Sequence, residues 1–104
     1  MAIAQSVVNS IMCLEDIVRN RWIHRILIIC PDNEQCLYAQ RVLTSLDYMV
    51  ETILLDDVYS ERGTYYSSIE RLRKGLSKVL VTTADVLSVI QKSADTRLGF
   101  DVIL

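Results

Sequence analysis

Apolar residues along this chain alternate between helical and strand periodicity. Over residues 3–19 they recur every three or four positions, which is typical of an amphipathic helix with one buried face. Residues 25–30 then form a continuous, largely β-branched run, which is typical of a strand buried on both faces of a parallel sheet. Pro31-Asp32-Asn33 ends that strand, and an acidic or amide side chain there can cap a helix expected over residues 34–46.

The second half of the chain repeats this alternation. We expect strands over residues 48–55, 78–82 and 100–104, a loop over residues 56–63, and helices over residues 65–74 and 84–92. Gly75 provides a helix stop. The helix over residues 34–46 is expected to bury Leu37, Tyr38, Val42 and Leu43.

Strands that alternate with helices over short loops predict an α/β fold with a parallel β-sheet flanked by helices. We expect one domain over residues 1–104. No helix follows the last expected strand, so we expect the domain to continue beyond this chain or to be abbreviated.

Charge and cysteine content narrow the classes of function. The chain has a net charge of −2 and a pI near 5.3. It therefore lacks the excess of basic residues that a protein usually needs to bind nucleic acid by itself. Cys13, Cys30 and Cys36 share no metal-ligand spacing, and His24 is the only histidine, so we expect no metal site and buried thiols in a reducing compartment. With neither a secretory signal nor an apolar run of about 20 residues, the sequence predicts a cytoplasmic protein with no membrane contact.

In a parallel sheet, ligands normally lie beyond the carboxyl ends of the strands. The candidate positions are therefore Pro31-Asp32-Asn33, Asp56-Asp57 and Thr82-Thr83. None of them is glycine-rich, and the sequence holds neither phosphate-loop motif, so we expect no nucleotide cofactor. Asp56-Asp57 could hold a divalent metal, but adjacent aspartates after a strand more often form a solvated turn.

Two basic clusters and a group of tyrosines remain. The clusters are Arg19, Arg21, His24 and Arg25, and then Arg71, Arg73, Lys74 and Lys78. Solvent-exposed basic side chains are favoured near a helix C-terminus by the helix dipole, and this explains both clusters better than contact with a phosphate backbone does. Tyr59, Tyr65 and Tyr66 flank the start of a predicted helix, and aromatic residues there are either core or interface residues.

Four segments resemble the C-terminal RecA-like lobe of superfamily-2 RNA helicases. Leu46-Asp47-Tyr48-Met49-Val50 is similar to the family's L-G-Y-x-V turn, and Ser68 to Gly75 looks like its helix ending in F-x-x-G. Val79-Leu80-Val81-Thr82-Thr83 looks like the v-L-V-a-T strand, and residues 100–104 resemble the v-d-l-V-I strand. The resemblance covers essentially the whole chain and implies a RecA-like fold.

The same resemblance implies that catalysis is lost. After v-L-V-a-T the family has D-x-x-x-R-G-x-D, where this chain places Ala84, Ser88, Val89 and Gln91. The arginine-finger motif would fall beyond residue 104, and such a finger is worth about 10³–10⁵ in rate. We therefore expect no ATP turnover from this chain and no enzyme.

A competing alignment matches residues 79–100 to the v-A-T-P-G-R-L strand and helix of the N-terminal helicase lobe, with Ala84 and Asp85 in place of its proline and glycine and Leu87 in place of its leucine. That lobe needs a phosphate loop before the first helix, and this chain has none. The C-terminal lobe is the preferred reading. An enzyme resembling a receiver domain or phosphatase ranks last, because no aspartate ends the strand at Val79.

A degenerate lobe at the start of a chain also looks like the N-terminal region of the Tudor-domain helicase-like proteins of the piRNA pathway. That resemblance implies self-association, as a homodimer or larger assembly, and a role in building cytoplasmic, perinuclear granules. The interface candidates are Tyr59, Tyr65 and Tyr66. The alternative is a residual lobe that binds single-stranded RNA through Thr82, Thr83, Arg71, Arg73 and Lys74.

Overall fold

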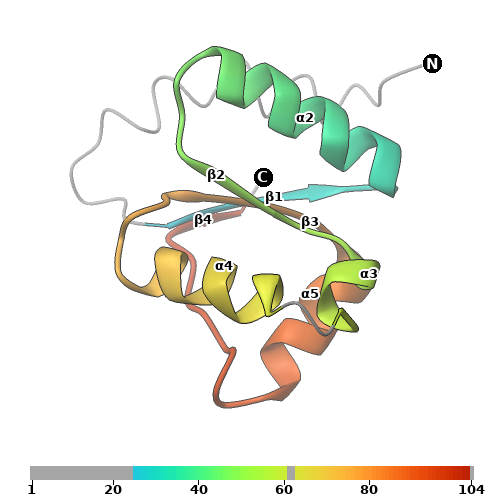
Figure 1. Ribbon diagram of the computed structural model, residues 1–104, viewed down its shortest axis with the longest axis vertical. Coiled ribbons are helices and arrows are strands. Elements are labelled where there is room, and N and C mark those ends of the chain that lie inside the picture. Colours follow the sequence, from blue (N-terminus) through green and yellow to red (C-terminus); the bar gives the residue numbers. More distant parts are fainter. Residues whose placement is uncertain (1–24, 61–62, 104) are drawn as a thin grey trace.

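One parallel sheet lies at the centre of the computed structural model, which describes residues 25–60 and 63–103 (Figure 1). Within these residues its strands are β1 (Ile26–Cys30), β2 (Val50–Ile53), β3 (Val79–Thr83) and β4 (Val102–Ile103). The order across the sheet is β2-β3-β1-β4, and every pairing is parallel. The expected parallel α/β fold is therefore confirmed, and it is consistent with a RecA-like arrangement. The helix expected over residues 3–19 lies outside the described residues.

The two inner strands are the ones that the sequence marks most clearly. Strand β1 is a continuous apolar run and β3 begins with one, because each strand has neighbours on both edges and helices over both faces (Figure 1). Successive side chains point to opposite faces of the sheet, so Ile26 and Ile28 enter one core layer and Leu27 enters the other. The edge strand β2 reads Val-Glu-Thr-Ile and has no such run.

Helices cover the two faces of the sheet unequally. Helix α2 (Asn33–Ser45) lies on one face, whereas α4 (Thr64–Arg73) and α5 (Ala84–Lys92) lie on the other, with the short α3 (Leu55–Val58) beside them (Figure 1). The layer under α2 is built from Ile26, Ile28, Cys30, Cys36, Ala39, Leu43, Val79 and Val81. The layer under α4 and α5 holds Leu27, Ile53, Tyr65, Ile69, Leu72, Leu80, Val86, Ile90 and Leu98.

The buried face of α2 differs from the expected one. Only Leu43 of the four expected residues is fully buried; Leu37 is exposed, and Tyr38 and Val42 are half-buried. The helix instead turns Cys36 and Ala39 toward the sheet. Cys36, Ala39 and Leu43 recur at helical spacing. The small side chains of Cys36 and Ala39 allow the helix to approach the strands closely.

The expected loop over residues 56–63 was also wrong in part, because α3 occupies its beginning. The carboxylate of Asp57 accepts a 2.8 Å hydrogen bond from the backbone N–H of Leu54, which satisfies a donor at the start of this one-turn helix. Asp57 thus acts locally on the backbone, as the turn-former interpretation predicted.

Two helices end in the same hydrogen-bond pattern with different residues. After α4, Gly75 has φ +77°, and the N–H of Leu76 bonds to the carbonyl of Arg71. After α2, the left-handed residue is Asp47, with φ 67°, and the N–H of Tyr48 bonds to the carbonyl of Leu43. Both ends form Schellman motifs, in which glycine is the usual left-handed residue. The stop expected at Gly75 is confirmed.

Among the described residues, no helix has the length and apolar character needed to cross a membrane.

Candidate functional site

A crevice opens where the chain leaves β1 and β3 in opposite directions. From the end of β1 the chain passes to α2 on one face, and from the end of the adjacent β3 it passes to α5 on the other. Such a switch point is the usual ligand position in open α/β sheets. The crevice is lined by Pro31, Asp32, Asn33, Glu34, Leu55, Thr83 and Asp85. Of the candidate positions, Pro31-Asp32-Asn33 and Thr83 line this crevice, whereas Asp56, Asp57 and Thr82 are not among its lining residues.

The crevice is acidic. Among the described residues that line it, the charged ones are the carboxylates of Asp32, Glu34 and Asp85, and none is a cation. Asp32 caps α2 by accepting a 2.8 Å hydrogen bond from the backbone N–H of Gln35. Glu34 and Asp85 lie in the first turns of α2 and α5, where they already complement the helix dipoles. A phosphate would meet like charge here, without a glycine-rich cradle.

The described residues offer no group of three or more histidine, cysteine, aspartate or glutamate side chains that could hold a metal ion. Asp56 and Asp57 lie outside the crevice lining, on α3.

The two threonines predicted to contact RNA differ in exposure. Thr82 is fully buried, and its hydroxyl donates a 2.7 Å hydrogen bond to the carbonyl of Ile53. Thr82 therefore ties β3 to the edge strand β2 and presents no surface to a ligand. Thr83 is half-buried at the N-cap of α5 and lines the acidic crevice.

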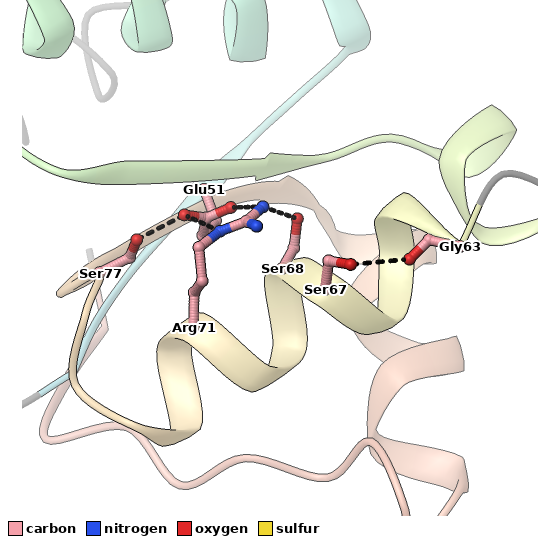
Figure 2. A network of polar contacts seen from close by, with 6 residues as sticks. All are labelled: Glu51, Gly63, Ser67, Ser68, Arg71 and Ser77. Carbon is pink, nitrogen blue, oxygen red and sulfur yellow. Dashed lines mark hydrogen bonds and ion pairs between the residues drawn. The ribbon is translucent and has the colours of Figure 1, made fainter.

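Arg71 is engaged by a buried carboxylate. Its Nε and Nη2 donate to the two carboxylate oxygens of Glu51, at 3.0 and 2.8 Å, and Nη2 lies 3.3 Å from the hydroxyl of Ser68. The hydroxyl of Ser77 donates a third hydrogen bond to Glu51 (Figure 2). Glu51 belongs to β2, so this cluster joins the edge strand to α4 and to the start of β3.

The surroundings of Glu51 keep it ionised. Glu51 is only 8% exposed, and its burial is the largest single influence on its pKa, which burial by itself raises. The hydrogen bonds from Arg71, Ser77 and Ser68 together with the charge of Arg71 outweigh burial, and the net pKa is lowered. The hydrogen bond to Glu51 correspondingly raises the pKa of Arg71. The guanidinium is thus part of a structural ion pair.

Arg73 and Lys74 stand on the solvent side of α4. Arg73 forms a 3.0 Å ion pair with Glu70 and donates to the carbonyl of Asp95 at 2.6 Å. Lys74 lies 3.9 Å from Glu70. These residues end α4, which leads into the start of β3, whereas Thr83 ends β3. The RNA candidates therefore lie at opposite ends of the sheet and do not form one surface.

The other basic cluster falls mostly outside the described residues, which exclude Arg19, Arg21 and His24. Arg25 is described, and its backbone N–H donates to the carboxylate of Asp101 at 3.0 Å.

The three tyrosines do not form one stripe. Tyr65 is buried in the core layer under α4, and its ring meets that of Tyr66 edge-on, with centroids 5.2 Å apart. Tyr59 and Tyr66 are 74% and 63% exposed. Two of the three interface candidates are thus at the surface, and Tyr65 is a core residue.

The structure also exposes an apolar group that the sequence reading did not single out. Leu46, Met49 and Leu76 are 56%, 64% and 61% exposed. All three lie at the end of the sheet where β2 and β3 begin, and the carbonyl of Met49 accepts from the N–H of Lys78 there. We call these three residues the apolar corner. A signal was present in the sequence, because the hydrophobic residue after a Schellman glycine usually packs against an apolar residue five positions earlier, and that position is Arg71 here.

The four positions that depart from the helicase pattern lie on α5. Ala84 and Ser88 are exposed, and Val89 is half-buried. The side-chain amide of Gln91 donates to the carbonyl of Leu98 at 2.9 Å and accepts from its N–H at 3.1 Å. Gln91 therefore anchors the segment that connects α5 to β4.

Comparison with protein-family models gives no match to this chain, and comparison with curated protein sequences gives none either.

Proposed function

We propose that this chain is a non-catalytic α/β interaction module that self-associates through the end of the sheet carrying the apolar corner. The carrying observation is the exposure of Leu46, Met49 and Leu76 at the end of the sheet where the edge strand β2 begins. Within the described residues no strand pairs with that edge. An open edge with large apolar side chains next to it is a surface suited to pairing with another chain.

The edge also lacks the devices that usually prevent pairing. Strand β2 holds no proline or lysine, and its one charged residue, Glu51, is turned inward and neutralised by Arg71. A charge that is already paired inside the fold does not deter a second strand. A second copy of the chain offers the same edge, and two such edges can meet around a two-fold axis.

The acidic crevice supports the non-catalytic part of the proposal. Nucleotide-binding α/β lobes hold phosphates at this position with backbone amides and cations. Here the charged groups are Asp32, Glu34 and Asp85, which repel phosphate. The resemblance to Tudor-domain helicase-like proteins extends the proposal to ribonucleoprotein granules, with self-association as the assembling step.

The test is the oligomeric state measured by size-exclusion chromatography with light scattering from low to high micromolar concentration. We expect concentration-dependent dimers or larger species, and loss of these in the Met49→Glu/Leu76→Glu variant. Leu37→Glu is the matched control, because Leu37 is also an exposed leucine but lies on α2, away from the β2 edge. A wild-type chain that stays monomeric at high micromolar concentration overturns self-association. A dimer equally weakened by both variants overturns the assignment to the corner.

A second candidate function, weak binding of single-stranded RNA, is favoured by one groove. Tyr66, Glu70, Arg73, Asp95 and Arg97 line a depression between α4 and the segment after α5. An exposed tyrosine ring beside two arginines can stack a base and contact phosphate, although two carboxylates oppose the phosphate. Fluorescence anisotropy with a labelled oligonucleotide at low and high salt tests it. Absence of binding at low salt removes this function.

A further inference from the structure

The crevice and the apolar corner lie at opposite ends of the sheet. All paired strands run in the same direction, so the turns after β1 and β3 stand at one end and the connection from α4 to β3 stands at the other (Figure 1). The crevice belongs to the first end and the corner to the second. Because the length of the strands separates them, one copy of the chain cannot bring these two surfaces into contact.

The crevice combines apolar and acidic groups. Leu55 is 41% exposed, and Pro31 is also exposed in the lining. The carboxylates of Asp32, Glu34 and Asp85 line the same hollow, with no cation among its described lining residues. A hollow of this kind suits an apolar side chain that carries positive charge beside it.

The corner carries the opposite combination. Leu76 is 61% exposed in the turn between α4 and β3. Lysines flank it in the sequence, of which Lys74 is 67% exposed and Lys78 is half-buried. Asp47 adds one exposed carboxylate at this end, and the two arginines of α4 are each paired with a carboxylate and add no net charge. The two lysines therefore leave the corner positively charged.

Self-association through the corner can close on itself or remain open. A contact between two corners around a two-fold axis brings the same positively charged surface of both copies together, and like charges oppose each other there. A contact between the corner of one copy and the crevice of another joins opposite charges and brings exposed leucines together. Charge complementarity thus favours the second arrangement.

We propose that the corner of one copy docks in the crevice of the next, an inference that rests on the proposed self-association. Leu76 then packs against Leu55 and Pro31, and Lys74 faces the carboxylates of the crevice. An apolar group that fits a hollow elsewhere on the same molecule makes a contact that does not close, so each bound copy leaves one corner and one crevice free. Copies therefore add in a row, and the assembly grows beyond a dimer.

The experiment uses full-length variants that each disable one surface. Met49→Ser/Leu76→Ser removes apolar side chains from the corner and keeps the crevice. Leu55→Lys/Asp85→Lys places two cations in the crevice and keeps the corner. Circular dichroism and urea denaturation establish that each variant folds, and Glu34→Gln/Asp85→Asn is a second crevice variant that adds no cation.

Leu37→Lys/Asp95→Lys is the matched control for the crevice. It makes the same two exchanges at exposed positions outside the crevice lining, so it changes the net charge equally.

Sedimentation velocity over a concentration series reports the size of the assembly. We expect wild type and the matched control to grow past two copies without a plateau, and to dissociate as salt is added. Leu55→Lys/Asp85→Lys should weaken association by about tenfold or more, because like charges then meet. Glu34→Gln/Asp85→Asn should weaken association and reduce its dependence on salt.

Mixing the two disabled chains is the sharpest arm of the experiment. Met49→Ser/Leu76→Ser keeps a working crevice and Leu55→Lys/Asp85→Lys keeps a working corner, so together they hold one complete contact. We expect a one-to-one complex with twice the 11.9 kDa mass of one chain, and no growth beyond it.

Three results overturn the inference while leaving self-association in place. The first is a wild-type assembly that stops at two copies and is unaffected by the crevice variants, which indicates a closed dimer. The second is the absence of a complex between the two disabled chains at concentrations where wild type associates. The third is equal weakening by the crevice variant and its matched control. A wild-type chain that stays monomeric at low salt removes self-association itself and this inference with it.

Discussion

Replacing Arg71 by alanine tests how far the edge strand depends on a single ion pair. The substitution removes the two hydrogen bonds to Glu51 and the one to Ser68, and it leaves the carboxylate with the hydroxyl groups of Ser77 and Ser68 as partners (Figure 2). The Glu51 side chain is 10% exposed, so water replaces the lost partner poorly.

The expected magnitude follows from burial on the two sides of the pair. Removing one partner of a fully buried pair costs about 3–5 kcal/mol. Arg71 is itself 44% exposed, which lets water screen the pair and enter the space left by the truncation. We therefore expect a loss of about 2 kcal/mol in the free energy of unfolding, in the range for hydrogen bonds to charged groups. For a chain of this size that corresponds to a fall of about 8–16 °C in Tm.

The assay is urea denaturation followed by circular dichroism, with Lys74→Ala as the matched control. Lys74 lies on the same helix in a solvent-exposed pair with Glu70, so its removal is expected to cost about 0.5 kcal/mol or less. The Glu51→Gln and Glu51→Gln/Arg71→Ala variants complete a double-mutant cycle. We expect the double variant to be more stable than the sum of the single losses predicts, because it leaves no unpaired charge buried.

The reasoning is refuted if Arg71→Ala costs no more than Lys74→Ala, or if the two substitutions at Glu51 and Arg71 are additive. Either result means that the carboxylate does not depend on the guanidinium, so that this ion pair does not hold the edge strand in place.

The remaining predictions follow from individual contacts. Because folding lowers the pKa of Glu51, its ionised carboxylate adds to the free energy of unfolding at any pH above the ordinary glutamate pKa of about 4.3. That contribution is lost as the pH falls through the lower pKa of the folded state. The difference in urea midpoint between wild type and Glu51→Gln should therefore shrink in acid. Asp47→Gly should increase the free energy of unfolding by about 0.5–1 kcal/mol and so raise Tm, because glycine adopts a φ of 67° without steric cost. An unchanged or lower Tm contradicts this. Asp32→Ala should cost about 1 kcal/mol in unfolding free energy through loss of the α2 cap, and Asp32→Asn should largely retain it. Thr82→Val should cost about 1 kcal/mol, because the carbonyl of Ile53 loses a buried donor, and equal urea midpoints for wild type and variant would show that this bond adds nothing.

Most strands and helices could be predicted from the sequence, because the local hydrophobic pattern there matches the burial in the folded structure. Strands β1 and β3 are buried on both faces, so β1 is a continuous apolar run and β3 begins with three apolar residues. The helix expected over residues 84–92 matches α5 in its bounds, and Gly75 ends α4 as its backbone freedom suggests. The rule for parallel sheets named Pro31-Asp32-Asn33 and Thr83, which line the crevice, but it also named Asp56, Asp57 and Thr82, which do not.

The local pattern was misleading where tertiary contacts choose among acceptable faces. Residues 34–46 hold enough apolar side chains for more than one buried face, and the sheet selected Cys36 and Ala39 over the larger Leu37. The three tyrosines look alike in sequence, but only Tyr65 points into the core layer under α4. Thr82 and Arg71 looked available for RNA because their partners, Ile53 and Glu51, are remote in sequence.

By itself, the sequence determined an alternating α/β chain with an acidic balance and without a glycine-rich phosphate cradle, because periodicity, charge and motif composition are local properties. Only the tertiary structure decided the strand order β2-β3-β1-β4, and with it the edge position of β2 and the burial of Glu51 against Arg71. These features join segments that are distant along the chain or that lie on different elements. Their energies arise from desolvation and partner geometry, which exist only once the sheet has assembled.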